Sequence, residues 1–412
     1  MTEHITGIPQ MLPTQVIDTS TDSREILAHA RLAARKRKLQ DWFIADIDAH
    51  HVETVSWKEI VQYIEDPVIR EQAIYFHNDR IGAPPYGLNG DLGLRYQSVG
   101  GRIPHQDGLR EKTDDAVVGV HRDVTLTRRA MDSLGVDNMI VFPTPMLFLG
   151  LHPQPEMEVW LSRAYNRWMV DNLLSPDSRI KTLAVLPFNS PLEAEREVRE
   201  MAGKKGVIGF CIPSTRHKPV HHNDYMRLYR MIEETGMPVS FHAGYHWDDP
   251  SIKTVNRFLG MHALGFTWPN IVHCTNWVLN GIPIRFPKLK TIWIESGLAW
   301  VPFLMQRLDD QFLMRPSEAP HLKRLPSEYM RDHCWYTTQP METTNLKALE
   351  CTLDMIKAET QLLFASDWPH FDFDLPSEIT DLPFLSEQAK RNIHGLNAAR
   401  IFGLDPTPVK QI

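Results

Sequence analysis

The sequence predicts an α/β protein in which helices cover both faces of a parallel sheet. From residue 42 onward, short and continuously apolar runs alternate with longer amphipathic segments. Continuous apolar strands are typical of parallel sheets, because helices bury both faces of such a sheet. About eight strand–helix units can be counted, which is the number that closes a TIM (β/α)8 barrel. A doubly wound open sheet is the alternative, although no glycine-rich fingerprint follows the first strand.

The elements are expected in a regular order along the chain. A helix over residues 23–40 precedes the first strand, which begins at Trp42, and a second helical segment is expected over 55–77. The later strands are expected at 138–142, 180–186, 206–212, 238–242, 289–295, 333–338 and 362–367. The later helices are expected at 123–134, 156–173, 192–202, 224–235, 301–313, 346–358 and 386–402, with two more between 242 and 289.

The chain is expected to divide into three parts. Residues 1–40 form an N-terminal arm and helix, residues 41–404 form the barrel, and residues 405–412 form a C-terminal tail. Within the barrel, residues 80–120 are dense in glycine and proline, which marks irregular backbone. We therefore expect a long insertion after the first strand. Loops of this length are usually functional or disordered, and a lid over the site or an oligomer contact are the candidate roles.

Composition and charge exclude several classes of protein. The net charge is −7 and no long basic run occurs, which argues against nucleic-acid binding. No apolar run is long enough to span a bilayer, and the N-terminus lacks a signal-peptide pattern. The four cysteines are not in C-x-x-C spacing, which fits reduced thiols better than disulfides or a thiolate zinc site. We therefore expect a cytoplasmic protein.

The end of the first strand carries a dense set of metal-ligand residue types, from Asp46 to Glu53. Side chains two apart in a strand share a face, so Asp46, Asp48 and His50 are expected to point the same way. Burying several ionisable groups so close together is costly unless a cation or hydrogen bonds compensate. This strand end therefore predicts a divalent metal site, with a solvated strand end as the alternative.

Three later strands also end in ligand-type residues. His242 ends the fifth expected strand, Glu295 the sixth and Asp367 the eighth. In a (β/α)8 barrel the carboxyl ends of the strands meet at one mouth, where the chemistry takes place. Aspartate, glutamate and histidine without cysteine suit a hard or borderline ion. We expect zinc first, with manganese or iron as alternatives.

Aromatic residues flank these strand ends and are expected to wall an aromatic or apolar pocket, with ordinary core packing as the alternative. They are Tyr245, Trp247, Trp300, Trp335 and Trp368. A small-molecule carboxylate is the expected substrate.

With these residues in place, the chain resembles the amidohydrolase-related family, in the branch that includes aminocarboxymuconate-semialdehyde decarboxylase. The resemblance covers about residues 42–404. The matching segments, in this order, are Asp46–His50, Pro238–Gly244, Arg285–Lys290, Glu295–Pro302, Arg307–Asp309, Phe364–His370 and Asn397–Gly403. This resemblance implies a distorted TIM barrel with one catalytic divalent metal, commonly zinc or manganese.

The resemblance also implies the ligand set Asp48, His50, His242 and Asp367. The family contains hydrolases, hydratases and non-oxidative decarboxylases of small carboxylic acids, and it implies a homo-oligomer, most simply a dimer. One departure concerns the end of the sixth strand, where the decarboxylase members have a catalytic histidine and this chain has Glu295. A carboxyl group there can donate a proton at neutral pH only if its pKa is raised.

Three functional hypotheses follow. The first is a single-metal hydrolase or decarboxylase in which Asp367, Glu295 and His242 are catalytic. The second is a non-haem di-iron oxygenase on the same barrel, with Glu53 and Glu295 as additional ligands. The third is a non-catalytic barrel that forms a hetero-oligomer with an active homologue.

Overall fold

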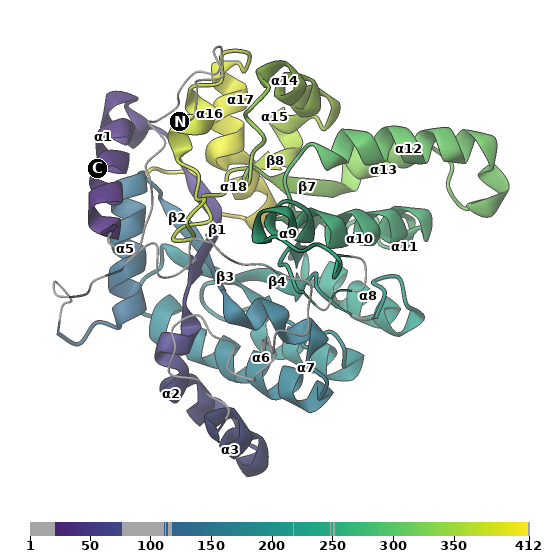
Figure 1. Cartoon of the computed structure of the whole chain (residues 1–412). Coiled ribbons are helices and arrows are strands. Elements are labelled where there is room, and N and C mark those ends of the chain that lie inside the picture. The colour runs from purple at the N-terminus through teal and green to yellow at the C-terminus, as the bar shows by residue number, and fades with distance from the viewer. Residues whose placement is uncertain are drawn as a thin grey trace.

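The computed structural model describes residues 21–75, 111, 113, 118–216, 218–247, 249 and 252–410. It contains one sheet of eight parallel strands in the order β1 to β8, with helices around the outside (Figure 1). The predicted (β/α)8 barrel is therefore confirmed. The strands are β1 (Ala45–His51), β2 (Asn138–Pro143), β3 (Ile180–Val185), β4 (Val207–Pro213), β5 (Val239–His242), β6 (Thr291–Ile294), β7 (Cys334–Thr337) and β8 (Leu362–Leu363).

The barrel closes where β1 meets the chain that follows β8. Ala49 and Trp368 form an isolated parallel bridge. The amide of Ile47 donates to the carbonyl of Phe364 at 3.0 Å, and the amide of Asp367 donates to the carbonyl of Asp48 at 2.7 Å. Two residues of the expected metal site therefore lie on the seam itself.

Helices follow the strands in the expected alternation. They are α1 (Ser23–Lys36), α2 (Trp57–Ile60), α3 (Pro67–Tyr75), α5 (Arg122–Leu134), α6 (Pro155–Met169), α7 (Pro191–Met201), α8 (Met226–Thr235), α9 (Phe258–Gly265), α10 (Thr267–Leu279), α11 (Ile282–Arg285), α12 (Trp300–Met314), α13 (Pro326–His333), α14 (Leu346–Met355), α15 (Ala358–Gln361), α16 (Pro376–Thr380), α17 (Glu387–Arg391) and α18 (Asn397–Phe402). None of the described helices is long and apolar enough to cross a membrane.

Several expected boundaries are wrong for identifiable reasons. The segment 55–77 is not one helix, because Pro67 lacks an amide proton and starts α3 anew after short helical turns. The closing helix over 386–402 is interrupted by a π-helical turn at Asn392–Leu396. There Gly395 packs so closely on the chain just before β1 that an added Cβ would lie 2.4 Å from the carbonyl oxygen of Phe43. The first strand starts at Ala45 instead of Trp42, because its pairing with β2 begins with Ala45 and Asn138.

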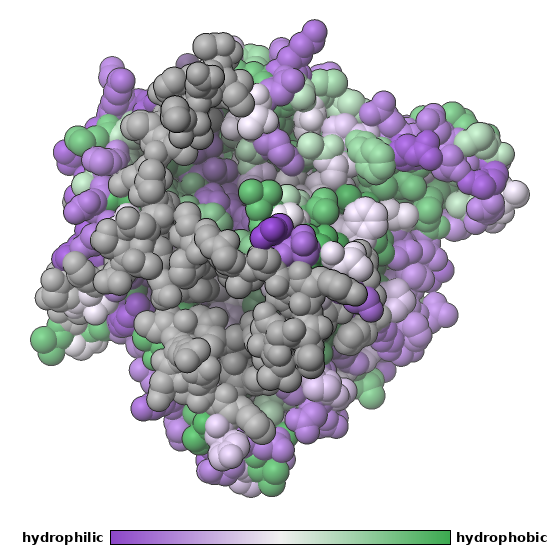
Figure 2. Space-filling view, viewed as in Figure 1, coloured by the Kyte–Doolittle hydropathy of each residue, from purple (hydrophilic) through white to green (hydrophobic). Residues whose placement is uncertain are grey.

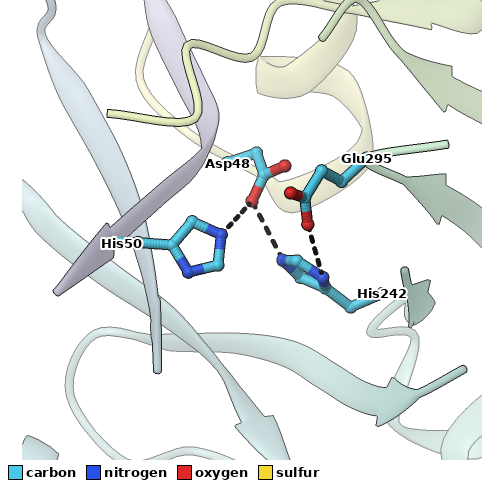
Figure 3. A group of neighbouring side chains, drawn as sticks. All are labelled: Asp48, His50, His242 and Glu295. Atoms are coloured by element: carbon cyan, nitrogen blue, oxygen red, sulfur yellow. Dashed lines mark hydrogen bonds and ion pairs between the residues drawn. The ribbon is translucent and has the colours of Figure 1, made fainter. Parts of the chain in front are cut away.

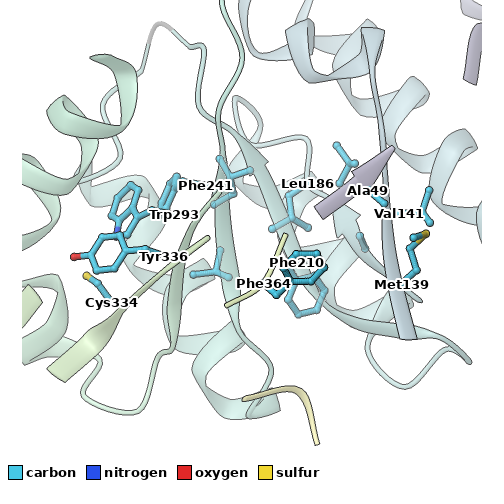
Figure 4. Packing of buried hydrophobic residues seen from close by; sticks show 14 of the residues in the cluster. Ala49, Met139, Val141, Leu186, Phe210, Phe241, Trp293, Cys334, Tyr336 and Phe364 are labelled. Atoms are coloured by element: carbon cyan, nitrogen blue, oxygen red, sulfur yellow. The ribbon is translucent and has the colours of Figure 1, made fainter. Parts of the chain in front are cut away.

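Two layers of apolar side chains hold the barrel together. The interior is filled by a cluster that includes Ile47, Phe142 and Ile294, whereas a larger cluster lies between the strands and the helices. In the larger cluster, the rings of Phe241 and Trp293 stack at 4.8 Å (Figure 4). Figure 2 shows mainly hydrophilic side chains over α8, as expected when a helix packs its apolar face on the strands. All four cysteines are free thiols.

The proposed division into arm, barrel and tail stays a prediction. Residues 1–20 of the arm lie outside the described residues, and the expected insertion at 80–120 is described only at 111, 113 and 118–120. The tail is described up to Lys410, whose ammonium group lies 2.6 Å from the buried carboxylate of Asp137. That carboxylate also accepts the amides of Ile44, Val409 and Lys410, at 2.9, 2.7 and 3.0 Å. Asp137 therefore ties the tail to the start of β1.

Substitutions in this pair should have unequal effects on stability. Asp137→Ala leaves a buried ammonium group and three amides without their acceptor, and should lower the free energy of unfolding by about 3–5 kcal/mol. Lys410→Met leaves the Asp137 carboxylate with its three amide donors, although it removes the donor to the Trp42 carbonyl, and should cost less, about 1.5–3 kcal/mol. Denaturant unfolding measures both values. Equal losses would contradict this account of the tail.

Candidate metal centre

A bulge in β1 sets which side chains of the first motif face the barrel mouth. Asp46 pairs with Met139 and Ala49 with Val141, so β1 contains one residue more than β2 between these pairs. A bulge of this kind changes the strict alternation of side chains. Ile47 accordingly belongs to the interior cluster, whereas Ala49 belongs to the outer one.

The expectation that Asp46 shares a face with Asp48 and His50 is therefore wrong. The buried Asp46 carboxylate instead accepts the amides of Ser366 at 3.0 Å and Asp48 at 3.1 Å, and it also accepts the hydroxyl of Ser366. Burial raises the pKa of Asp46 to about 7. Asp46 thus connects β1 to the chain after β8, directly beside the site.

Four buried residues converge at the mouth, as Figure 3 shows. Asp48 and His50 come from β1, His242 ends β5, and Glu295 follows β6. Each offers one ligand atom, and these four atoms all lie within 4.8 Å of one another. The Nε2 atoms of His242 and His50 lie 3.0 and 3.3 Å from Asp48 Oδ1. His242 Nδ1 lies 3.4 Å from Glu295 Oε2.

Hydrogen bonds orient both histidines toward this centre. His50 Nδ1 donates to the carbonyl of Pro143 at 3.0 Å, and His242 Nδ1 donates to the carbonyl of Ala243 at 2.9 Å. When Nδ1 carries the proton, Nε2 keeps its lone pair and can bind a metal. Both rings therefore present Nε2 to the same space.

Asp367 joins this group through His50. The Nε2 atom of His50 lies 3.3 Å from Asp367 Oδ1, and His370 Nδ1 lies 2.7 Å from the same oxygen. Together His50, Asp367 and His370 form a second buried group of possible ligands. His370 is a site residue that our sequence reasoning did not single out, although it belongs to the matching segment Phe364–His370. Its only sequence signal is its position three residues after Asp367.

Two of the carboxylates sit on strained backbone. Glu295 and Asp367 have φ angles of 55° and 58°, in the left-handed region that side chains other than glycine rarely adopt. Among the described residues only Lys38 and Lys357 share this property. The barrel holds the strained positions by hydrogen bonds, since Glu295 donates its amide to Thr337 Oγ1 at 3.0 Å. Strain of this kind is concentrated at functional sites.

The three carboxyl groups of the centre have pKa values that are shifted in different directions. Burial raises the pKa of Glu295 well above its usual range, and the neighbouring Asp367 and Asp48 raise it further. Burial also raises the pKa of Asp367, with Asp372 and Asp48 adding to the shift. For Asp48, burial is outweighed by His242 and His50, and the pKa is lowered.

Two histidines of the centre, His50 and His370, are neutral at pH 7. Burial is the main cause that lowers the pKa of His50 to about 3 and that of His370 to about 4. Neutral imidazole is the form that binds metals.

The polar atoms at the centre fit a divalent cation. Four of them are buried and make no hydrogen bond within the described part of the chain: Asp48 Oδ2, His50 Nε2, Glu295 Oε2 and Asp367 Oδ2. Buried polar atoms without partners are rare, and each one calls for an explanation such as a missing ion. Carboxylate oxygen and imidazole nitrogen without sulfur suit zinc, manganese or iron.

Glu53 and His51, which lie beside the motif, have other partners. Glu53 accepts the amides of Thr144 at 2.9 Å and Met146 at 2.7 Å, one on each carboxylate oxygen, and it lies outside both ligand groups. Burial raises its pKa to about 7. His51 hydrogen-bonds Asp123 and Tyr165, each at 2.9 Å. These contacts favour Glu53 as an anchor for the segment after β2 over Glu53 as a ligand.

The aromatic residues expected around the site fall into different places. Tyr245 lies near Phe148, with ring centroids 6.0 Å apart, just beyond His242. Trp300 donates to the carbonyl of Gly297 at 2.9 Å, whereas Trp335 donates to the carbonyl of Thr360 at 3.2 Å. Thr360 precedes β8, so Trp335 lies at the opposite end of the barrel from the centre.

Comparison with known families agrees with the fold. The amidohydrolase family model matches residues 119–404 of the chain. The chain belongs to the amidohydrolase family. The resemblance inferred from the strand-end motifs is thereby confirmed.

Individual relatives lie in the decarboxylase branch of this family. Gamma-resorcylate decarboxylase from Rhizobium sp. (strain MTP-10005) is 22% identical over 294 residues, which are 69% of this chain and 88% of that protein. 2-Amino-3-carboxymuconate-6-semialdehyde decarboxylase from Dictyostelium discoideum is 22% identical over 275 residues, 66% of this chain and 74% of that protein.

A solved structure has the same fold. Dihydroxybenzoic acid decarboxylase from Polaromonas sp. JS666, solved with bound manganese and the inhibitor 2-nitroresorcinol, superposes with a TM-score of 0.60 at 17% identity. The superposition covers 88% of this chain and 97% of that one.

Metal binding should release a proton, because Asp367 holds its proton to a higher pH than an ordinary aspartate and must lose it to become a ligand. Metal affinity should therefore rise with pH up to the raised pKa of Asp367, by about tenfold per pH unit for each proton released. Titration calorimetry of Mn²⁺ in buffers of different ionisation enthalpy counts the protons. Binding heats independent of the buffer would contradict the assignment.

Proposed function

We propose that this amidohydrolase-family protein is a metal-dependent enzyme that decarboxylates a small aromatic carboxylic acid without oxidation. Hydrolysis at the same centre is the alternative reaction. The observation that carries the proposal is the convergence of Asp48, His50, His242 and Glu295 within 4.8 Å at one buried centre. The names of its relatives, which include a gamma-resorcylate decarboxylase, support the choice of reaction.

The residues divide into a metal-holding set and a proton donor. Asp48, His50, His242 and Asp367 would hold one divalent ion, zinc or manganese. When bound, such an ion would polarise and orient an oxygen of the substrate. Glu295 lies beside His242, with its Oε2 atom 3.4 Å from His242 Nδ1, and would act as the proton donor.

Glu295 can take the role that the histidine has in the decarboxylase members. Its buried position is the main cause that raises its pKa, so the carboxyl group keeps a proton that it can donate. As the bond between the ring carbon and the carboxyl carbon breaks, its electron pair stays on the ring carbon. That carbon takes the proton of Glu295, carbon dioxide leaves, and water returns a proton to Glu295.

The residues beside the centre support an aromatic substrate. Phe148 follows β2 and lies between Tyr245 and His246, with centroid distances of 6.0 and 5.8 Å. Aromatic side chains pair with aromatic rings at such distances. This aromatic group beyond β5 therefore supports the choice of an aromatic acid as the substrate.

The reaction is tested with 2,6-dihydroxybenzoate and the manganese-loaded or zinc-loaded enzyme. We expect carbon dioxide and resorcinol, with one deuterium on the vacated carbon when the solvent is D2O. Glu295→Gln should lower kcat about 10²- to 10⁴-fold without loss of metal, since it removes the proton donor. Glu350→Gln, on the exposed face of α14, is the matched control and should be silent.

Two results would contradict the proposal. The first is full activity in Glu295→Gln, which would remove the proton donor from the mechanism. The second is a rate that depends on dissolved oxygen, which would favour the di-iron oxygenase hypothesis. An enzyme that hydrolyses esters or lactones but leaves hydroxybenzoates intact would favour hydrolysis.

A further inference from the structure

His370 links the candidate metal centre to a residue of the segment that follows β2. Its Nδ1 atom lies 2.7 Å from Asp367 Oδ1, and its Nε2 atom lies 3.2 Å from Thr144 Oγ1. Asp367 and His370 follow β8, whereas Thr144 follows β2. The ring of His370 also packs on that of His50, with centroids 4.3 Å apart.

We propose that Thr144 is a positioning residue, whose hydroxyl group fixes the tautomer and orientation of His370 so that His370 holds Asp367 in place for the metal. This inference rests on the proposed metal-dependent function and adds to it a residue that lies outside the ligand set.

The direction of each hydrogen bond follows from the chemistry of Asp367. A carboxylate that binds a cation is ionised, and an ionised carboxylate only accepts hydrogen bonds. At 2.7 Å, His370 Nδ1 must then carry the proton and donate it. A neutral imidazole has one proton, so Nε2 is left as an acceptor that needs a donor. The Thr144 hydroxyl lies 3.2 Å from Nε2 and supplies that donor as a three-centre hydrogen bond, because it shares its one proton with the carbonyl of His51 at 3.0 Å.

Thr144 is itself held firmly. Its amide donates to the buried Glu53 carboxylate at 2.9 Å, and its hydroxyl also donates to the carbonyl of His51 at 3.0 Å. A chain of contacts therefore runs from Glu53 through Thr144 and His370 to Asp367. This gives Glu53 a purpose near the metal centre that does not require it to be a ligand.

Metal ligands commonly depend on such outer partners. A histidine or carboxylate beside a ligand fixes its orientation, and losing one such partner costs about 10- to 100-fold in metal affinity. His370 could instead be a ligand of a second ion, since it belongs to the second ligand group. Its 2.7 Å contact with Asp367 favours the hydrogen bond.

Two substitutions of Thr144 test the role of its hydroxyl group separately from the shape of the side chain and from the backbone amide. Thr144→Val has nearly the same shape and keeps the amide that Glu53 accepts, but it lacks the hydroxyl. Thr144→Ser keeps the hydroxyl. The measurement is the dissociation constant of Mn²⁺ for the metal-free full-length protein, by competition with a chromophoric chelator. We expect Thr144→Val to raise that constant about 10- to 100-fold and Thr144→Ser to restore it to within about threefold of wild type.

A double-mutant cycle tests whether Thr144 acts through His370. In a His370→Asn background, the side-chain amide can still donate to Asp367 but does not extend to Thr144. Thr144→Val should then cause no further loss of affinity, because the residue through which it acts is gone. Thermal unfolding of the metal-free variants shows whether the fold is intact.

The outcomes are distinct. Wild-type affinity in Thr144→Val, no rescue by serine, or an equal loss in the His370→Asn background would each overturn the inference. A second Mn²⁺ per chain that disappears in His370→Asn would make His370 a ligand, and would also overturn it. These titrations need no substrate. If Mn²⁺ binds as expected but the enzyme decarboxylates nothing, only the proposed function is rejected and the inference about Thr144 stands. A wild-type protein that binds no Mn²⁺ would overturn both.

Discussion

The repulsion among three buried carboxyl groups is the constraint on which the rest of the centre depends. Asp48, Glu295 and Asp367 lie at one end of the barrel, away from water, and two of them have raised pKa values as a result. In the described part of the chain, one oxygen of each makes no hydrogen bond. Such an arrangement is costly for a folded protein unless a cation balances the charge. The metal-free protein is therefore less stable at this centre than it would be with apolar side chains, and the same carboxyl groups allow it to bind a metal.

The barrel seam and the metal centre are the same region. The amide of Asp367 closes the barrel on Asp48, and Asp46 accepts hydrogen bonds from both sides of the seam. The strained φ angles of Glu295 and Asp367 persist because these long-range contacts determine the backbone. A small change in the seam would thus move two carboxylates at once, which couples the geometry of the fold to metal binding.

The sequence alone was sufficient to predict the barrel and the residues that meet at its mouth. Apolar strands and amphipathic helices predicted the order of elements, and the rule that strand ends meet predicted that Asp48, His50, His242, Glu295 and Asp367 lie together. The details that failed depend on partners distant in sequence. Strict alternation misplaced Asp46, because the bulge in β1 is set by its pairing with β2. Glu53 resembled a ligand, yet its partners are the amides of Thr144 and Met146. His370 gave too weak a signal because its role depends on contacts with Asp367 and Thr144.

The most direct test of the central claim is the number of metal ions bound per chain, measured by plasma mass spectrometry on natively purified protein. The account predicts one zinc or manganese ion per chain, close to none in Asp48→Asn, and an unchanged content in Glu53→Gln. Two ions per chain that include iron, or a full metal content in Asp48→Asn, would contradict it.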